Sequence, residues 1–319
     1  MTSSAVLRLG TRNSPLARWQ SGWVASQLCE RGVDVELIPI TTRGDVVSGA
    51  LGSVGGQGLF TKKIQQALLD RQVDLAVHSL KDLPTDEVPG LALAAVPPRA
   101  GMLDAYVSNQ WDNLDQLPDG SIVGTGSLRR RTQLLRLRPD LEIRDIRGNV
   151  DTRLGKLDGG EFDAILLAEA GLVRLGLEAR ITQRLSPEIM LPAVGQGALG
   201  LETRADDAGV RELLAPLDHV ATRAAVTAER QMLAALRGGC LAPVGAWGRV
   251  VDGVLSLDGV VLNRDGQERV FASHTAPLEE AVDLGQRVAD NLLSQGAADL
   301  ISSLRSSTSN RDSAEPSQE

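Results

Sequence analysis

The chain has 319 residues and a formal net charge of −8, and its composition is 42% hydrophobic but only 3% aromatic. That length favours two or three domains, and the aliphatic composition is typical of α/β proteins with buried strands. The negative charge argues against a nucleic-acid partner. The N-terminus lacks a basic segment leading into an apolar stretch, and no apolar run could span a bilayer, so we expect a cytoplasmic protein without membrane contact.

Two stretches of the chain repeat one pattern. Residues 6–14 predict a strand, a Gly-Thr turn and a serine cap before a helix over residues 15–30. Residues 122–127 repeat this pattern before a helix over residues 128–137. Two further pairs of predicted strands echo each other in the same order; they are residues 35–40 with 141–146, and residues 73–79 with 162–168. The repeats predict two βαβαβ units.

Two such units indicate two similar open α/β domains of the periplasmic-binding-protein type, with a ligand in the crevice at the carboxyl ends of the strands. A strand over residues 198–203 is expected to return the chain to the first domain. The predicted domains are the first at residues 1–97 with 198–216, the second at 103–192, a small α+β domain at 220–305, and a disordered tail at 306–319.

The third domain is predicted to contain a helix ending near Leu236, three short strands and a last helix near residues 278–295. It carries Cys240 after two glycines, and this exposure beside a cationic cleft favours a thiolate. Cys29 falls in a predicted helix and is expected to be an inert packing residue. Two cysteines and three scattered histidines show no metal-binding spacing, so we expect no metal.

Arginines gather at the predicted strand ends. Residues 124–131 combine a serine cap with three consecutive arginines, which indicates an anion site at a helix start. Because neighbouring helical residues point about 100° apart, Arg131 is expected to lie in solvent. Arg147 and Arg153 follow the next strand end. We expect Arg129, Arg130 and Arg147 to bind carboxylates in a dry cleft, since buried cations without a partner cost stability.

Residues 79–84 end another predicted strand and contain Lys81 and Asp82. From the residues alone a structural ion pair is the simpler interpretation, although the strand-end position also makes Asp82 the leading acid–base candidate. The glycine-rich residues 55–60 lack the spacing of a nucleotide-binding loop and are expected to belong to a mobile lid over residues 43–60.

Seven motifs in order resemble the porphobilinogen deaminase family across nearly the whole chain. They are Gly-Thr-Arg-Asn-Ser-Pro-Leu-Ala at 10–17, Thr-Arg-Gly-Asp at 42–45, Val-His-Ser-Leu-Lys-Asp-Leu-Pro at 77–84, Gly-Thr-Gly-Ser-Leu-Arg-Arg at 124–130, Ile-Arg-Gly-Asn-Val-Asp-Thr-Arg at 146–153, Leu-Pro-Ala-Val-Gly-Gln-Gly at 191–197, and Gly-Gly-Cys at 238–240. One departure is Gln57, where relatives often have lysine.

The resemblance implies a monomeric enzyme in which Cys240 holds a dipyrromethane cofactor through a thioether. Four porphobilinogen molecules are condensed onto this primer with loss of ammonia, which gives hydroxymethylbilane. Asp82 is implied as the catalytic carboxylate. The implied cofactor contacts are Ser79, Lys81, Thr125, Ser127, Arg129, Arg130, Arg147, Arg153 and Gln196. The implied substrate contacts are Arg12, Ser14, Arg147, Arg153 and Arg174.

Two rival functions come from other classes. A non-catalytic two-domain anion-binding protein would explain the duplicated α/β units, but it leaves Cys240 and the third domain without a role. A thiol hydrolase would use Cys240, but no histidine stands beside it in the sequence.

Overall fold

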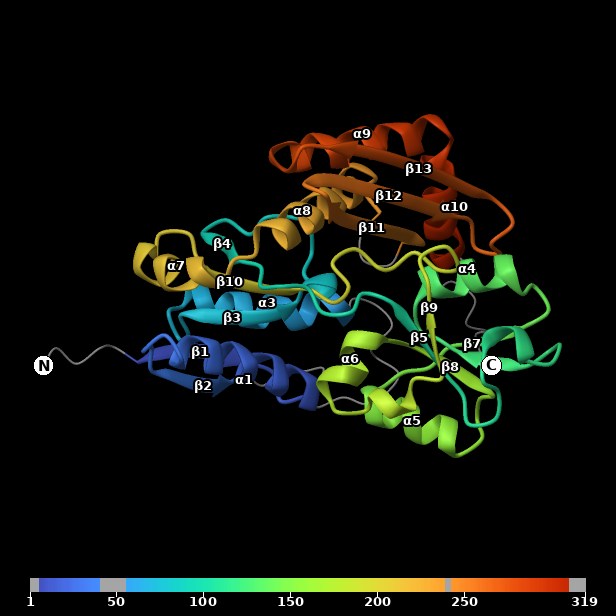
Figure 1. Cartoon of the computed structure of the whole chain (residues 1–319), viewed down its shortest axis with the longest axis horizontal. Coiled ribbons are helices and arrows are strands. Elements are labelled where there is room, and N and C mark those ends of the chain that lie inside the picture. The colour runs from blue at the N-terminus through green and yellow to red at the C-terminus, as the bar shows by residue number, and fades with distance from the viewer. Residues whose placement is uncertain (1–5, 41–55, 239–241, 310–319) are drawn as a thin grey trace, which may run out of the picture.

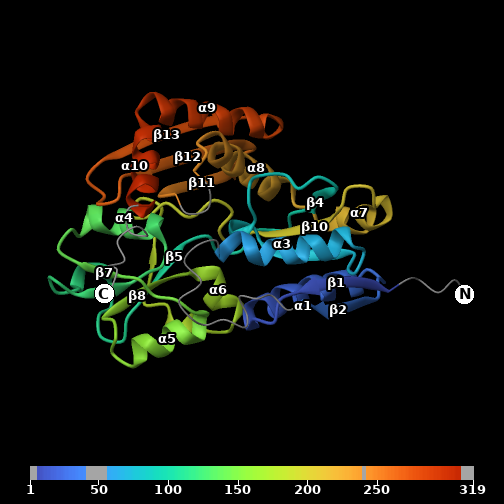
Figure 2. The same ribbon diagram turned by 180° about the vertical axis from the view of Figure 1, so that it is seen from behind.

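The computed structural model describes residues 6–40, 56–238 and 242–309. Two α/β domains lie side by side, and a smaller domain of helices and an antiparallel sheet lies above both of them (Figures 1 and 2). The expected fold class, two similar open α/β domains and a small C-terminal α+β domain, is confirmed.

The two larger sheets have the same topology. The first has the order β2-β1-β3-β10-β4, formed by β1 (Leu7–Thr11), β2 (Val35–Pro39), β3 (Leu75–Ser79), β4 (Leu91–Ala95) and β10 (Leu199–Arg204). The second has the order β7-β6-β8-β5-β9, formed by β5 (Asp104–Val107), β6 (Ile122–Gly124), β7 (Glu142–Arg144), β8 (Ala164–Ala168) and β9 (Gln183–Leu185). In each sheet the first three strands are parallel, as the repeats predicted, and the last two pairings are antiparallel.

Equivalent helices begin with equivalent caps. Helix α1 (Pro15–Cys29) follows Ser14, whose hydroxyl accepts from Ala17 N, and α4 (Leu128–Leu137) follows Ser127, whose hydroxyl accepts from Arg130 N. Each serine satisfies a backbone donor that the helix leaves unpaired. The remaining α/β-domain helices are α3 (Gly56–Leu69), α5 (Val150–Asp158), α6 (Glu169–Arg174) and α7 (Ala208–Leu214). The predicted helices therefore start where the sequence placed them.

The third domain packs helices on one face of an antiparallel sheet. Its strands are β11 (Val244–Val251), β12 (Val254–Leu262) and β13 (Arg269–Ala276), and its helices are α8 (Val220–Ala235), α9 (Ala281–Ser294) and α10 (Ala297–Ser309). Small and aliphatic residues of α8 and α9, among them Ala228, Met232 and Val288, form the core with the sheet. Burial of this apolar surface holds the domain together.

A buried ion pair joins the third domain to the connection between the other two. Glu229 of α8 is fully buried and accepts from Arg99 Nη1 at 2.7 Å and Nη2 at 3.2 Å. The same carboxylate accepts from the backbone N–H groups of Gly195 at 2.7 Å and Gly248 at 2.8 Å. One carboxylate therefore contacts both connecting segments and the third sheet.

Three sequence expectations need correction. Residues 56–60 form the first turns of α3 where a flexible glycine-rich loop was expected, while residues 41–55, which contain most of the expected lid, and the Gln57 side chain lie outside the described residues. Cys29 is exposed rather than packed, because it lies in the last turn of α1 facing away from the core. Helix α10 continues to Ser309, past residue 306 where the tail was predicted to begin.

Within the described ranges, no helix has the length and apolar character needed to cross a membrane.

The buried ion pair of Glu229 with Arg99 predicts a large loss of stability when Glu229 is changed. We expect Glu229→Gln to lower the free energy of unfolding by about 3–5 kcal/mol, because Arg99 is left as a buried cation without its anion. The control is Glu142→Gln, since Glu142 is 53% exposed in its pair with Arg144 and a solvent-screened pair should contribute little to stability. Urea unfolding measures both, and equal midpoint shifts would contradict the assignment.

Candidate anion-binding active site

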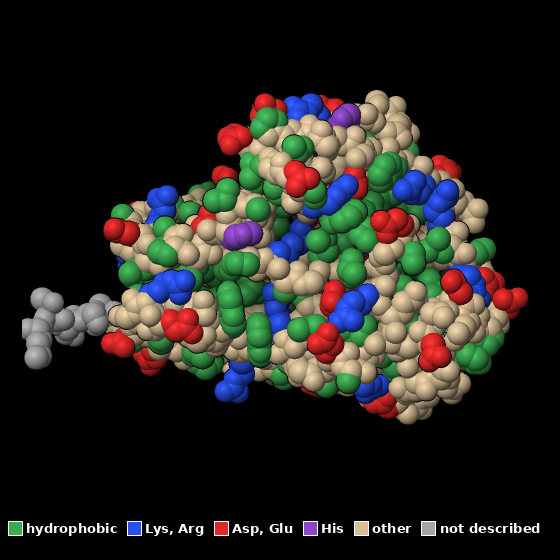
Figure 3. Space-filling model, viewed as in Figure 1, with side chains coloured by type: hydrophobic (Ala, Val, Ile, Leu, Met, Phe, Trp, Pro, Cys, Tyr) green, Lys and Arg blue, Asp and Glu red, His purple; other side chains and the backbone are tan. Residues whose placement is uncertain are grey.

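The strand-end residues of both α/β domains meet in one cluster of charges. Lys81 and Asp82 lie in the short 3₁₀ helix that follows β3, and Arg153 lies in α5 of the other domain. Asp82 influences the pKa values of both Lys81 and Arg153, so all three side chains lie within electrostatic reach. Figure 3 shows Lys and Arg side chains in the hollow between the two domains.

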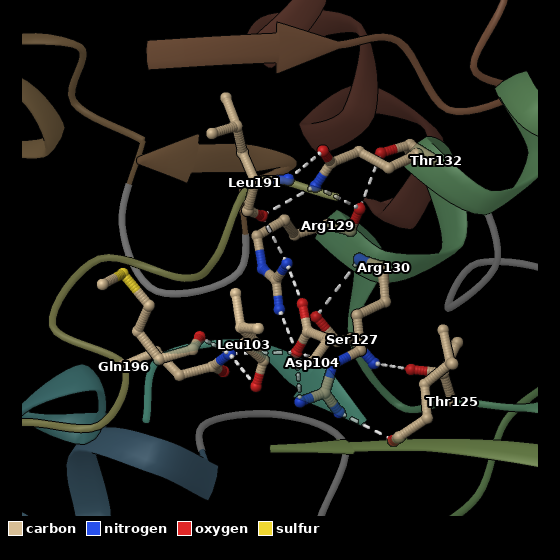
Figure 4. Close-up of polar contacts among 12 residues, drawn as sticks. Leu103, Asp104, Thr125, Ser127, Arg129, Arg130, Thr132, Leu191 and Gln196 are labelled. Atoms are coloured by element: carbon tan, nitrogen blue, oxygen red, sulfur yellow. Dashed lines mark hydrogen bonds and ion pairs between the residues drawn. The ribbon is translucent and has the colours of Figure 1, made fainter. Parts of the chain in front are cut away.

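Asp104 lies next to this cluster and binds Arg129 and Arg130, two further arginines at the start of α4 (Figure 4). Its carboxylate is fully buried at the start of β5 and accepts from Arg129 Nη1 at 2.7 Å and from Arg130 Nε at 2.8 Å. Gln196 Nε2 also donates to Asp104, at 3.0 Å. Arg129 and Arg130 therefore have an anion within the protein, and the expectation that their charges need an external anion for stability is wrong.

Charge pairing outweighs burial at Asp104. Burial alone would raise the pKa of this carboxyl, but Arg129 and Arg130 hold it well below its ordinary value. Burial lowers the pKa of Arg130, which Asp104 opposes and Arg129 reinforces. The result is a fixed buried group with two cations sharing one carboxylate, which leaves positive charge in excess.

The excess positive charge affects the pKa of Lys81. Burial lowers its pKa to about 8, Asp82 opposes the shift, and Arg130 reinforces it. Burial also lowers the pKa of Arg153, with further contributions from Arg130 and Arg147. An anion arriving at this cluster would relieve the repulsion among these cations.

The other predicted contacts differ in exposure. Arg147 is 71% exposed and pairs with Asp145 at 2.8 Å, so the expectation of a dry environment is wrong for this residue. Arg131 is half-buried and donates to the carbonyl of Ile143 at 2.9 Å, rather than lying free in solvent. Arg12 and Ser14 are half-buried at the matching strand end of the first domain.

Four predicted contacts have partners within the protein. Ser79 Oγ accepts from Gln20 Nε2 at 2.8 Å, and Thr125 Oγ1 accepts from Ser127 N at 3.2 Å. Gln196 is fully buried and also donates to the carbonyl of Met102 at 2.8 Å. Such contacts fix the backbone and side chains around the charge cluster.

Arg174 bridges the two α/β domains. Its Nη2 donates to the carbonyl of Gly197 at 2.8 Å, and its guanidinium lies 5.8 Å from the centre of the Trp19 ring. Burial lowers its pKa to about 10. This arginine therefore lies where movement between the domains would change its environment.

Sequence reasoning missed Asp104 and Glu229. Both are acidic residues inside otherwise apolar segments, Leu-Asp-Ala-Tyr-Val at 103–107 and the alanine-rich α8. A carboxylate in such a segment must find a partner, because burial of an unpaired charge is costly. An acidic residue within an apolar segment was therefore the sequence signal that could have found Asp104 and Glu229.

The cluster suits an anionic ligand rather than a metal. Lys81, Arg129, Arg130, Arg147 and Arg153 supply five cations, and Asp82, Asp104 and Asp145 supply three carboxylates. Arg129 Nε and Gln196 Oε1 are buried without a hydrogen-bond partner among the described residues. In the same part of the chain no group of three His, Cys, Asp or Glu residues could hold a metal ion. Cys240 lies outside the described residues.

Comparison with known proteins covers nearly the whole described chain. A family model for "Porphobilinogen deaminase, dipyromethane cofactor binding domain" matches residues 7–212, and one for "Porphobilinogen deaminase, C-terminal domain" matches residues 223–294.

Similar solved structures include binding proteins. A putative methionine-binding lipoprotein from Bacillus subtilis is 13% identical, with a TM-score of 0.42 over 68% of this chain and 91% of that chain. A periplasmic substrate-binding protein of an ABC transporter from Coxiella burnetii is 16% identical, with a TM-score of 0.42 over 66% of this chain and 92% of that chain. At these values the similarity carries no functional inference.

The buried carboxylate predicts a pH-dependent stability difference. Asp104→Asn should lower the free energy of unfolding by about 3–5 kcal/mol at neutral pH, because two buried arginines lose their anion. Since the pKa of Asp104 is lowered by folding, its contribution is complete well above the ordinary value of 3.8 and declines as the pH falls below it.

Urea unfolding of the Asp104→Asn variant and the wild type at pH 7, 5 and 3 tests this expectation. The control is Asp145→Asn, because Asp145 is 60% exposed and should contribute less than about 1 kcal/mol at each pH. A difference between wild type and Asp104→Asn that stays the same from pH 7 to pH 3 would refute the ionised pair.

Proposed function

The chain belongs to the porphobilinogen deaminase family, and from this premise we propose that it is a hydroxymethylbilane synthase, a transferase of tetrapyrrole and haem biosynthesis. It condenses four porphobilinogen molecules head to tail onto a dipyrromethane primer and releases ammonia at each addition. The observation that carries the proposal is the cationic cluster around Asp82. Each pyrrole unit has an acetate and a propionate, so a growing chain brings many carboxylates to this cluster.

The family's cofactor is a dipyrromethane, bound by the domain that matches residues 7–212. When bound, it supplies a nucleophilic pyrrole carbon at the end of the chain. We assign its attachment to Cys240 through a thioether. The excess cations fit its carboxylates, with Lys81, Arg129, Arg130 and Arg153 as the holding groups. Charge-assisted hydrogen bonds of this kind contribute about 1.5–3 kcal/mol each.

Asp82 acts on the substrate. When the aminomethyl C–N bond of protonated porphobilinogen breaks, nitrogen keeps the bonding pair and leaves as ammonia, and the remaining methylene pyrrole becomes a delocalised cation. A fixed carboxylate stabilises that developing positive charge more than it stabilises the bound substrate. Lys81 and Arg153 lie within electrostatic reach of Asp82.

The cofactor assignment predicts a covalent mass. Intact wild-type protein under denaturing conditions should exceed its sequence mass by one dipyrromethane, and Cys240→Ser should lose both the added mass and the activity. The control is Cys29→Ser, which should keep both, because Cys29 is exposed at the far end of α1. A wild-type protein without the added mass would favour a non-catalytic anion-binding protein, and an adduct on Cys29 would exclude Cys240 as the attachment site.

The catalytic assignment predicts a charge-dependent loss at Asp82. Asp82→Asn should lower turnover by about 10²–10⁴-fold, because asparagine keeps the shape but loses the charge and the proton-transfer capacity. Asp82→Glu should retain more activity than Asp82→Asn, since the charge remains. Asp86→Asn is the control, because Asp86 is an exposed carboxylate in the same loop region.

Single-turnover assays on cofactor-loaded protein separate this role from cofactor loading. The Asp82→Asn variant is loaded with preformed tetrapyrrole, since Cys240 and the arginines are unchanged in it. Release of ammonia at a near wild-type rate would remove Asp82 from the mechanism. The monomeric state and the cytoplasmic location stay predictions from the sequence.

A further inference from the structure

The turn between β12 and β13 rests directly on the backbone of α4, the helix that carries Arg129 and Arg130 (Figures 1 and 2). Gly266 of this turn is buried and has a φ of +77°. A Cβ atom there would overlap the carbonyl oxygen of Thr132 and lie 2.9 Å from Arg136 N. Only glycine therefore allows the turn to sit this close to α4.

Arg136 fastens the turn to the helix. Its Nη1 donates to the carbonyl of Gln267 at 3.2 Å and to that of Gly266 at 3.4 Å. Within the turn, Asn263 Oδ1 accepts from Glu268 N at 3.1 Å, and Asp265 Oδ1 accepts from Gln267 N at 3.1 Å. These internal hydrogen bonds hold the turn in one conformation, so its contact with α4 is rigid.

A second, indirect connection runs from the same helix to the third domain through Leu191. Gln133 of α4 donates to the carbonyl of Leu191 at 3.0 Å and accepts from Leu191 N at 2.8 Å. Leu191 in turn lies against Gly245 of β11, where an added Cβ would be 2.8 Å from Leu191 Cβ. Helix α4 is therefore held against the third domain at two places along its length.

The turn and the segment that follows Cys240 lie at the same end of the third sheet. Val244 at the start of β11 pairs with Val261 near the end of β12. Leu262 N donates to the carbonyl of Pro243 at 3.3 Å, and the turn begins at the next residue. A displacement of the turn on α4 would therefore move this end of the sheet relative to Arg129 and Arg130.

We propose that the turn at residues 263–268 is a positioning element, which sets the cofactor-bearing end of the third domain in place over the arginine helix through Gly266 and Arg136. The inference rests on the proposed function. It adds a role for residues that touch neither the substrate nor the cofactor. Misplacement of reacting groups by about 1 Å can cost on the order of 10²-fold in rate. A small shift at this contact should therefore lower the rate of the reaction.

The chain provides a matched pair of glycines for the test. Gly253 lies in the other hairpin of the same sheet with a φ of +76°, but an added Cβ there meets nothing within 4 Å. Gly266→Ala and Gly253→Ala thus carry the same backbone strain, and only Gly266→Ala pushes on α4. We expect Gly266→Ala to lower kcat about tenfold or more with a KM for porphobilinogen within about threefold of wild type, because the cationic cluster itself is intact. Gly253→Ala should match the wild type in both constants.

A second variant tests the same contact without backbone strain. Arg136→Gln removes the donor to the turn, and Arg138→Gln is its control, because Arg138 donates to the carbonyls of Leu114 and Leu117 within its own domain. Arg136→Gln should lower kcat and leave KM nearly unchanged, while Arg138→Gln should leave both unchanged. If Gly266→Ala does not fold, this pair carries the test. Where both fold, the double variant should lose less than the product of the single losses, since both changes act on one contact.

All assays use protein whose dipyrromethane mass has been verified. Equal kcat values for Gly266→Ala and Gly253→Ala, or additive effects in the double variant, would overturn the positioning role and leave the proposed function intact. A wild-type protein that lacks the covalent mass would instead overturn the proposed function itself. A loss confined to thermal stability, with kcat unchanged well below the unfolding temperature, would make the turn merely structural and also overturn the inference.

Discussion

The ion pair of Asp104 with Arg129 and Arg130 is the constraint on which the site depends. One fully buried carboxylate neutralises part of two guanidinium charges and fixes both side chains at the start of α4. Because a buried ion pair gains little net stability over apolar packing, its value lies in orientation. The arginines are held rigidly, and their excess positive charge adds to that of Lys81 and Arg153, so the cluster can attract an incoming carboxylate.

The segment at residues 191–197 carries this constraint to the rest of the molecule. Leu191 accepts from Arg129 at 2.6 Å, Gly195 donates to Glu229, and Gln196 donates to Asp104. The same short segment thus touches the arginine helix, the third domain and the buried carboxylate. The two missed acids, Asp104 and Glu229, are the groups that anchor it, one on each side. Binding chemistry and domain arrangement are therefore maintained by shared contacts rather than by separate parts of the protein.

Local signals in the sequence predicted the repeated architecture well. Serine caps at Ser14 and Ser127 and the strand repeats located the helices and the paired units, because capping and alternation act over a few residues. Partners distant in sequence were not predictable in this way. Arg131 could be set apart from its neighbours by helical geometry, but its bond to the Ile143 carbonyl could not be foreseen. The strands of the third sheet were also predicted. The contact between its β12–β13 turn and α4 was not, because it joins residues about 130 positions apart in the chain.

The strand order has a consequence for how the chain acquires its structure. Strand β10 lies between β3 and β4 in the first sheet, yet it is made after every strand of the second sheet. On the ribosome the second sheet, contiguous from residue 104 to 185, has all its strands before the first sheet can close. Until then β3 and β4 expose unpaired edges, which are prone to association with other chains. The amino-terminal domain is thus the last of the two to be completed, and its sheet edges stay open until β10 has been made.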